Sequence, residues 1–115
     1  MKQQQTVRVV LVTCGTLTEA RRISRKVVTK RFAACANIVL GPVESIYRWR
    51  EKVEKAREWL LILKTTAARI RDLETEIKRL HSYDVPEFVV LPVTVVSRDY
   101  LTWLTDSTNR PPKTS

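Results

Sequence analysis

The sequence is short of the residues and segments that mark several specialised classes of protein. It contains two cysteines in 115 residues and no Cys-x-x-Cys motif, so a disulfide framework is not indicated. No apolar run approaches the ~20 residues of a transmembrane helix. The apolar segment at residues 7–12 is interrupted by Arg8 and is too short for a signal peptide. These absences predict a cytoplasmic protein without membrane contact, and the length suits one domain with a modest core.

Acidic residues are scarce relative to basic ones. The chain has 21 Lys and Arg against 12 Asp and Glu, a formal net charge of +9 and a pI of about 10.1. Residues 20–31 are typical of an amphipathic helix, because Ala20, Ile23 and Val27 project to one half and the basic side chains to the other. No aromatic residues interleave with these cations, so we expect a solvated face rather than a nucleic-acid platform. The basic half contains Arg21, Arg22, Arg25, Lys26 and Lys30.

Glycine and proline are absent from residues 46–66. The start of this stretch alternates apolar and polar residues and its end, residues 59–63, is continuously apolar, which predicts two long strands. Residues 50–58 between them are almost entirely charged, and no Asn-Gly or Asp-Gly marks a tight two-residue turn. We therefore predict a long hairpin that extends past the body of the domain and ends in a solvated tip. Such a hairpin exposes a template for strand pairing, which indicates assembly with other copies.

Hydrophobic periodicity and capping residues divide the rest of the chain into strands and helices. Gly41-Pro42 interrupts the second strand and Pro92 lies in the last one, and proline is tolerated only in edge strands or bulges. The predicted strands are residues 7–13, 35–40 continued by 43–50, 58–65 and 88–96. The predicted helices are residues 17–31 capped by Thr16 or Thr18, 67–81, and 98–105 capped by Ser97.

The order β-α-β-β-α-β with a terminal helix predicts an α+β, ferredoxin-like fold, with an antiparallel sheet and helices on one face. In that topology the first and third strands are central, and the two proline-broken strands are the edges. Cys14 ends the first strand and Cys35 begins the second, so we predict that they lie at opposite ends of the sheet, ~15–20 Å apart. We assign residues 1–109 to one domain and residues 110–115 to a disordered polar tail.

Seven short motifs occur in one order along the chain. They are Phe-Ala-Ala-Cys-Ala-Asn-Ile (32–38), Ser-Ile-Tyr-Arg-Trp (45–49), Lys-Val-Glu (52–54), Leu-Ile-Leu-Lys-Thr-Thr (61–66), His-Ser-Tyr-Asp-Val-Pro-Glu (81–87), Leu-Pro-Val-Thr (91–94) and Asp-Tyr-Leu-Thr-Trp-Leu (99–104). Together they resemble the CutA family, the divalent-cation tolerance proteins. The resemblance covers about residues 7–107, and although each motif is weak alone, seven in the right order are specific.

The resemblance implies a ferredoxin-like protomer in a tight homotrimer, shaped like the PII signalling proteins, in which the long hairpins pair between subunits. It also implies a role in tolerance of copper and other divalent metals. We expect copper or another divalent transition metal as ligand, without tight binding. The resemblance carries over no enzymatic mechanism, so no catalytic residues are predicted. The chain departs from the family at Ser82 and Asp84, where proline and glutamate are usual, and at residues 55–57, where Lys-Ala-Arg replaces acidic residues.

His81 is the only histidine and, with Asp84 and Glu87 nearby in sequence, is a candidate ligand for copper or zinc. The alternative is that its ring contacts the last carbonyls of its own helix. Cys35 is a candidate ligand for Cu(I) as a thiolate, or else a small buried hydrophobe. A single histidine cannot make a strong site in one chain, so we expect residues from a neighbouring subunit to contribute at an intersubunit cleft.

A second set of residues is predicted to line this intersubunit cleft, or alternatively to pack in cores and interfaces. The set comprises Tyr47, Trp49, Lys64, Tyr83 and Trp103.

The sequence leaves three functions as alternatives. The first is a metal-binding trimer that contributes to metal tolerance. The second is a PII-like signalling or interaction trimer that binds a small anionic ligand or a partner protein. The third is a nucleic-acid-binding trimer that uses the basic helix face.

Overall fold

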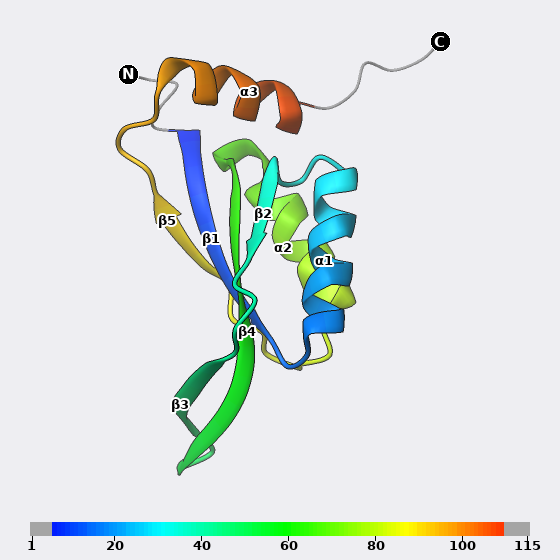
Figure 1. Cartoon of the computed structure of the whole chain (residues 1–115), viewed down its shortest axis with the longest axis vertical. Coiled ribbons are helices and arrows are strands. Elements are labelled where there is room, and N and C mark those ends of the chain that lie inside the picture. The colour runs from blue at the N-terminus through cyan, green and yellow to red at the C-terminus, as the bar shows by residue number, and fades with distance from the viewer. Residues whose placement is uncertain (1–5, 110–115) are drawn as a thin grey trace.

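The computed structural model describes residues 6–109 and shows an antiparallel sheet with helices packed against it, an α+β fold (Figure 1). No helix in these residues is long and apolar enough to cross a bilayer. The elements are, in chain order, β1 (Val7–Cys14), α1 (Leu17–Thr29), β2 (Cys35–Ile38), β3 (Val43–Trp49), β4 (Lys52–Thr66), the 3-10 turn η2 (Ala67–Arg69), α2 (Ile70–Leu80), β5 (Val89–Pro92) and α3 (Arg98–Thr108). The predicted tail at residues 110–115 lies outside the described residues.

The strand order confirms the predicted arrangement of centre and edges. The sheet runs β2-β4-β1-β5, and β3 pairs with β4 outside this path. β5 is shorter than predicted, because it ends at Pro92, which has no N–H to donate to a ladder. Cys14 pairs with Trp59 and Cys35 with Lys64, five positions apart along β4. The two free cysteines are therefore ~16 Å apart along the strand, as the sequence predicted.

The predicted long hairpin is confirmed, but the strand predicted at residues 58–65 begins earlier, at Lys52. β3 and the first half of β4 extend beyond the helices as a separate ribbon (Figure 1). Trp49 pairs with Lys52, so Arg50 and Glu51 form a tight two-residue turn, with φ of 50° and 68°. The left-handed conformation costs roughly 1 kcal/mol for each non-glycine residue. It is adopted because a turn of this hand matches the right-handed twist of the two strands.

The core lies between one face of the sheet and the two longer helices. Alternate residues of the central strands, including Val10, Val12, Leu61 and Leu63, are fully buried against apolar residues of α1 and α2. Thr16 caps α1 by accepting from the Glu19 N–H, as predicted. The predicted helix at residues 67–81 begins with a 3-10 turn. Helix α3, capped by Ser97, lies across the end of the sheet (Figure 1) and covers a second apolar cluster of Val7, Ala34, Leu101 and Leu104.

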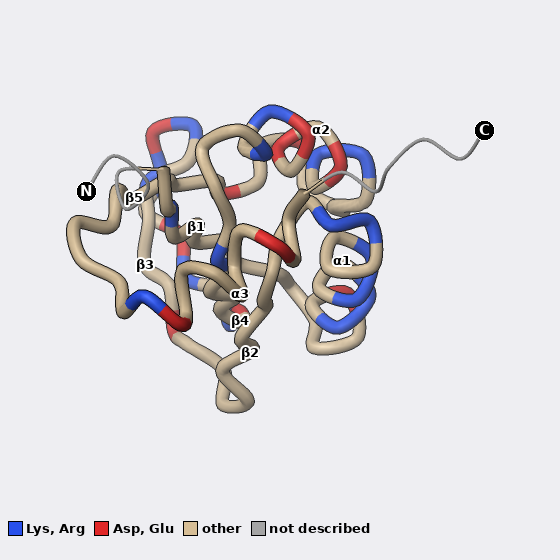
Figure 2. Tube along the Cα trace, turned by 90° about the horizontal axis from the view of Figure 1, so that it is seen from above, with Lys and Arg blue, Asp and Glu red and all other residues tan. Residues whose placement is uncertain are grey.

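The basic residues of α1 are exposed, as predicted, and Figure 2 shows where they lie along the helix.

One acidic side chain of α2 is partnered by a cation from its own helix and by one from the end of α1. Glu76 is buried, accepts two hydrogen bonds from Arg79 at 2.8 and 3.0 Å, and pairs with Lys30 at 2.9 Å. Arg79 and then Lys30 lower the pKa of Glu76 from 4.5 to about 2, against the effect of its own burial. This carboxylate therefore joins the two helices only while it is ionised.

We predict that Glu76→Gln lowers the free energy of unfolding by about 1 kcal/mol at pH 7, since the cationic partners are partly exposed and screened. Because the folded pKa lies below the ordinary value, this contribution is present above about pH 4.5 and is lost as the pH falls toward about 2. Urea unfolding at several pH values would measure it. Glu74→Gln, which breaks an exposed pair with Lys78, is the control and should cost less. A difference that is the same at pH 7 and pH 2 would contradict the assignment.

Candidate metal site

Three different donor groups converge where β1 ends. The ligand atoms of Cys14, Glu19 and His81 all lie within 4.8 Å of one another, and the three residues are buried. Cys14 is the last residue of β1, Glu19 lies in the first turn of α1, and His81 directly follows α2. We call these three residues the donor cluster. A thiol, a carboxylate and an imidazole together suit borderline and soft transition-metal ions better than Mg²⁺ or Ca²⁺.

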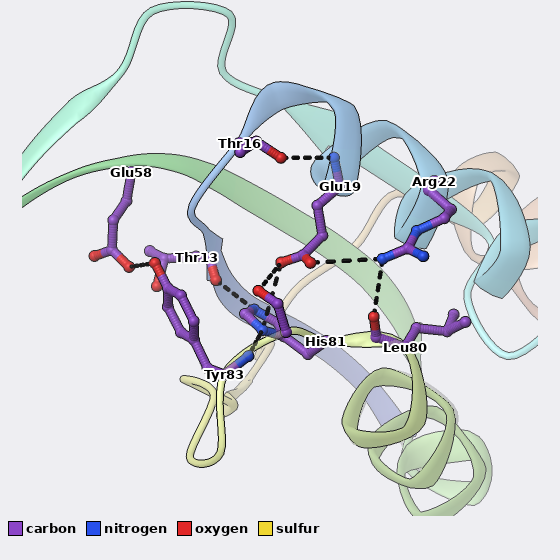
Figure 3. Close-up of polar contacts among 9 residues, drawn as sticks. Thr13, Thr16, Glu19, Arg22, Glu58, Leu80, His81 and Tyr83 are labelled. Atoms are coloured by element: carbon purple, nitrogen blue, oxygen red, sulfur yellow. Dashed lines mark hydrogen bonds and ion pairs between the residues drawn. The ribbon is translucent and has the colours of Figure 1, made fainter.

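Glu19 is held in place by its position at the start of α1 and by contacts with the end of α2 (Figure 3). Its N–H donates to the Thr16 hydroxyl at 3.1 Å, and its side chain is buried. Its Oε2 accepts from the Ser82 hydroxyl at 3.1 Å. Its Oε1 lies 3.5 Å from Arg22, which also donates to the Leu80 carbonyl at 3.0 Å. The carboxylate therefore lies at the junction of α1, α2 and the loop after α2.

The hydrogen bonds of His81 determine which ring nitrogen carries the proton. Nε2 lies 2.7 Å from the Thr13 carbonyl oxygen, which can only accept, so Nε2 carries the hydrogen. Nδ1 accepts from the Tyr83 N–H at 3.1 Å. The alternative from sequence, that the ring contacts the carbonyls of its own helix, is wrong, because the ring binds β1. A histidine that binds a metal commonly donates its other N–H to a backbone carbonyl in this way.

Two acceptor atoms of the donor cluster lie close together, Nδ1 of His81 and Oε2 of Glu19. They are 3.5 Å apart. In the tautomer fixed by Thr13, neither atom carries a hydrogen: the single lone pair of Nδ1 accepts from the Tyr83 N–H, and Oε2 accepts from the Ser82 hydroxyl. Two acceptors in this position fit the donor set of a bound cation.

Cys14 is held as a thiol by its surroundings. Burial, followed by the charges of Glu19 and Glu58, raises the pKa of Cys14 to about 12, although Arg22 acts in the opposite direction. A metal ion that binds here must therefore displace the thiol proton, because the thiolate is the ligand. The site favours ions that form strong bonds to sulfur.

The structure brings only one of the four predicted metal ligands into the donor cluster. Cys35 lies on β2, where its Sγ contacts Asn37 Oδ1 at 3.5 Å. Asp84 and Glu87 are exposed in the loop after α2. Partial desolvation of the Glu87 carboxyl, followed by the charge of Glu58, raises its pKa although the residue as a whole is exposed. Within residues 6–109, no other group of three such ligands comes together. Use of these residues at a site shared between subunits stays a prediction.

Sequence reasoning missed Cys14 and Glu19 as ligand candidates. The available signals were that Cys14 ends a strand and that Glu19 follows a helix cap, but neither indicates contact with a histidine more than 60 positions later. Of the predicted cleft residues, Tyr47, Trp49 and Trp103 are exposed and Lys64 is half-buried, with its Nζ 2.6 Å from Asn37 Oδ1. Tyr83 lies next to the donor cluster, where its hydroxyl donates to Glu58 at 2.9 Å (Figure 3).

We predict that His81→Ala lowers the free energy of unfolding by about 2–3 kcal/mol, because the Thr13 carbonyl and the Tyr83 N–H lose their buried partners. His81→Gln, which can donate and accept, should restore part of this loss. Urea unfolding in the presence of a chelator would measure both variants. Wild-type stability in His81→Ala would show that these hydrogen bonds contribute little.

Comparison with known proteins identifies the family. Residues 8–107 match the family described as CutA1 divalent ion tolerance protein. The divalent-cation tolerance protein CutA of Thermus thermophilus is 45% identical over 100 residues, which span 87% of this chain and 96% of that protein. The chloroplastic CutA of Arabidopsis thaliana is 41% identical over 87% of this chain, and the match covers 54% of its length.

Solved structures agree with the sequence comparison. The Thermus thermophilus protein superposes with a TM-score of 0.87 and 43% identity, covering 90% of this chain and 99% of that one. CutA1 from Oryza sativa superposes with a TM-score of 0.88 and 36% identity, covering 95% of this chain and 99% of that one. On these matches, the chain belongs to the CutA1 family of divalent ion tolerance proteins.

Proposed function

We propose that this chain binds divalent transition-metal ions, copper among them, and contributes to metal tolerance as a homotrimer. The observation that carries the proposal is the donor cluster, in which sulfur, nitrogen and oxygen ligands converge within 4.8 Å in a buried place. The Nε2–H of His81 already donates to Thr13, so its ring is oriented as a ligand before an ion arrives. The name of the Thermus thermophilus relative, a divalent-cation tolerance protein, supports the same role.

The surface supports assembly through the hairpin. Ile46 and Val53 on the hairpin are each 67% exposed, and Tyr47 and Trp49 are more than two-fifths exposed. On the sheet face opposite α1 and α2, Leu11, Leu60 and Ile62 are only half-buried. Apolar residues in both places favour burial against further copies of the chain. A homotrimer of ferredoxin-like protomers with paired hairpins, similar in shape to PII proteins, would cover them.

Two further expectations from the sequence stay proposals. The relatives are named for different compartments, chloroplastic in Arabidopsis thaliana and periplasmic in Archaeoglobus fulgidus, and we propose the cytoplasm for this chain. We also propose that the chain has no enzymatic activity, and that it acts by binding.

Native mass spectrometry with Cu(I), Cu(II) and Zn(II) tests the metal-binding function. We expect a trimer that takes up three ions in a fixed ratio. Cys14→Ser should reduce the uptake at least tenfold, because it replaces the thiolate ligand. Cys35→Ser is the matched control, and it should bind as the wild type does if the donor cluster, and not a site shared between subunits, holds the ion. A trimer without ions, or with ions in no fixed ratio, would overturn the function.

A second candidate is a PII-like trimer that binds a small anionic ligand at an intersubunit cleft. Lys64, a half-buried residue at the otherwise apolar end of β4, favours it. A thermal-shift screen with nucleotides and organic anions tests this function. We expect a ligand to raise the melting temperature by a few degrees in the wild type and not in Lys64→Met. A flat response across the set would argue against it.

A further inference from the structure

The loop after α2 occupies the atoms that a metal ion would need. The Tyr83 N–H lies 3.1 Å from Nδ1 of His81, and the Ser82 hydroxyl lies 3.1 Å from Oε2 of Glu19. These two acceptors lie 3.5 Å apart in the donor cluster. Nδ1 has one lone pair, so it cannot bind an ion and accept the Tyr83 hydrogen bond together. Metal binding and the present position of the loop therefore exclude each other.

Tyr83 also connects this loop to the base of the hairpin. Its hydroxyl donates to Glu58 Oε2 at 2.9 Å. Glu58 pairs with Val43 at the inner end of the β3–β4 ribbon, and the next residue of β4, Trp59, pairs with Cys14. Glu58 is therefore the point where β4 passes from the hairpin to the central sheet. We call the two hydrogen bonds of Tyr83, to His81 and to Glu58, the Tyr83 bridge (Figure 3).

The packing around Tyr83 fixes the position of its ring. A Cβ atom at Gly15 would lie 3.1 Å from the Tyr83 hydroxyl, so the ring packs directly against the turn between β1 and α1. The His81 and Tyr83 rings are in contact, with centroids 4.6 Å apart. Movement of the Tyr83 backbone away from His81 must then also disturb the hydroxyl contact with Glu58.

We propose that the Tyr83 bridge is a metal-responsive switch, in which an ion bound by Cys14, Glu19 and Nδ1 of His81 displaces the Tyr83 N–H and loosens the contact of the loop with the hairpin base. The inference rests on the proposed metal-binding function. Cys14 binds as a thiolate and its proton passes to solvent, while the Nε2–H of His81 keeps its bond to Thr13. The ion is of the class of Zn²⁺, which binds sulfur and nitrogen ligands in tetrahedral geometry. Its binding changes the contact between the loop and the base of the hairpin.

Hydrogen exchange tests the switch in the full chain. The Tyr83 amide loses its acceptor when Zn²⁺ binds, so deuterium uptake in residues 82–87 should rise when zinc is added. The rise should be absent in Cys14→Ser and present in Cys35→Ser. Uptake that is unchanged or lower in zinc-loaded wild type would overturn the switch and leave the metal-binding function intact.

Zinc affinity gives a second, independent readout. Tyr83→Phe removes the bond to Glu58, so displacement of the loop becomes easier, and zinc should bind about three- to tenfold more tightly. Tyr100→Phe is the matched control, since Tyr100 lies on α3 outside the bridge, and should bind as the wild type does. Equal or weaker affinity in a folded Tyr83→Phe protein would overturn the switch. Zinc binding retained by Cys14→Ser would place the ion elsewhere, and no binding by the wild type would overturn the function itself.

Discussion

The structure depends on one long strand, β4, which pairs with three others. Its second half pairs with β1 and β2 in the body and its first half pairs with β3 in the hairpin. Because β4 is one unbroken strand of 15 residues, the body and the hairpin share a continuous backbone, although its pairing partners change along the way. Glu58 is the residue where β4 changes its partner from β3 to β1. A displacement of the backbone there can therefore affect both the hairpin and the body.

The donor cluster is a consequence of where three elements end. β1 ends at Cys14, α1 begins two residues before Glu19, and α2 ends just before His81. Polar backbone groups at such ends lack partners within their own elements, so side chains and loop amides bind them. Here the Thr13 carbonyl accepts from His81, and the His81 ring in turn accepts from Tyr83. The hydrogen bonds that complete these ends also orient an imidazole beside a thiol and a carboxylate.

The net charge of the chain acts on a metal ion at long range, whereas the donor cluster would act on it at short range. A net charge of +9 repels cations at long range, and the exposed basic face of α1 is one source of that field. Within the donor cluster, local ligands determine affinity instead. For a thiophilic ion, the affinity is set mainly by the sulfur and nitrogen ligands. The affinity for Mg²⁺ or Ca²⁺ depends more on acidic oxygen ligands. The combination favours selection by ligand chemistry.

The sequence by itself determined the strand order, the edges, the long hairpin and the family, because apolar periodicity, proline positions and ordered motifs are local signals. It also predicted His81 as a candidate ligand, and the structure places His81 in the donor cluster. The sequence did not show that β4 begins at Lys52, directly after a two-residue turn at Arg50 and Glu51 that lacks the usual glycine. Only the tertiary structure decided that Cys14 and Glu19, rather than Cys35, Asp84 and Glu87, lie beside His81. The reason is that contacts between the ends of β1, α1 and α2 join residues far apart in sequence, and no periodicity records such contacts.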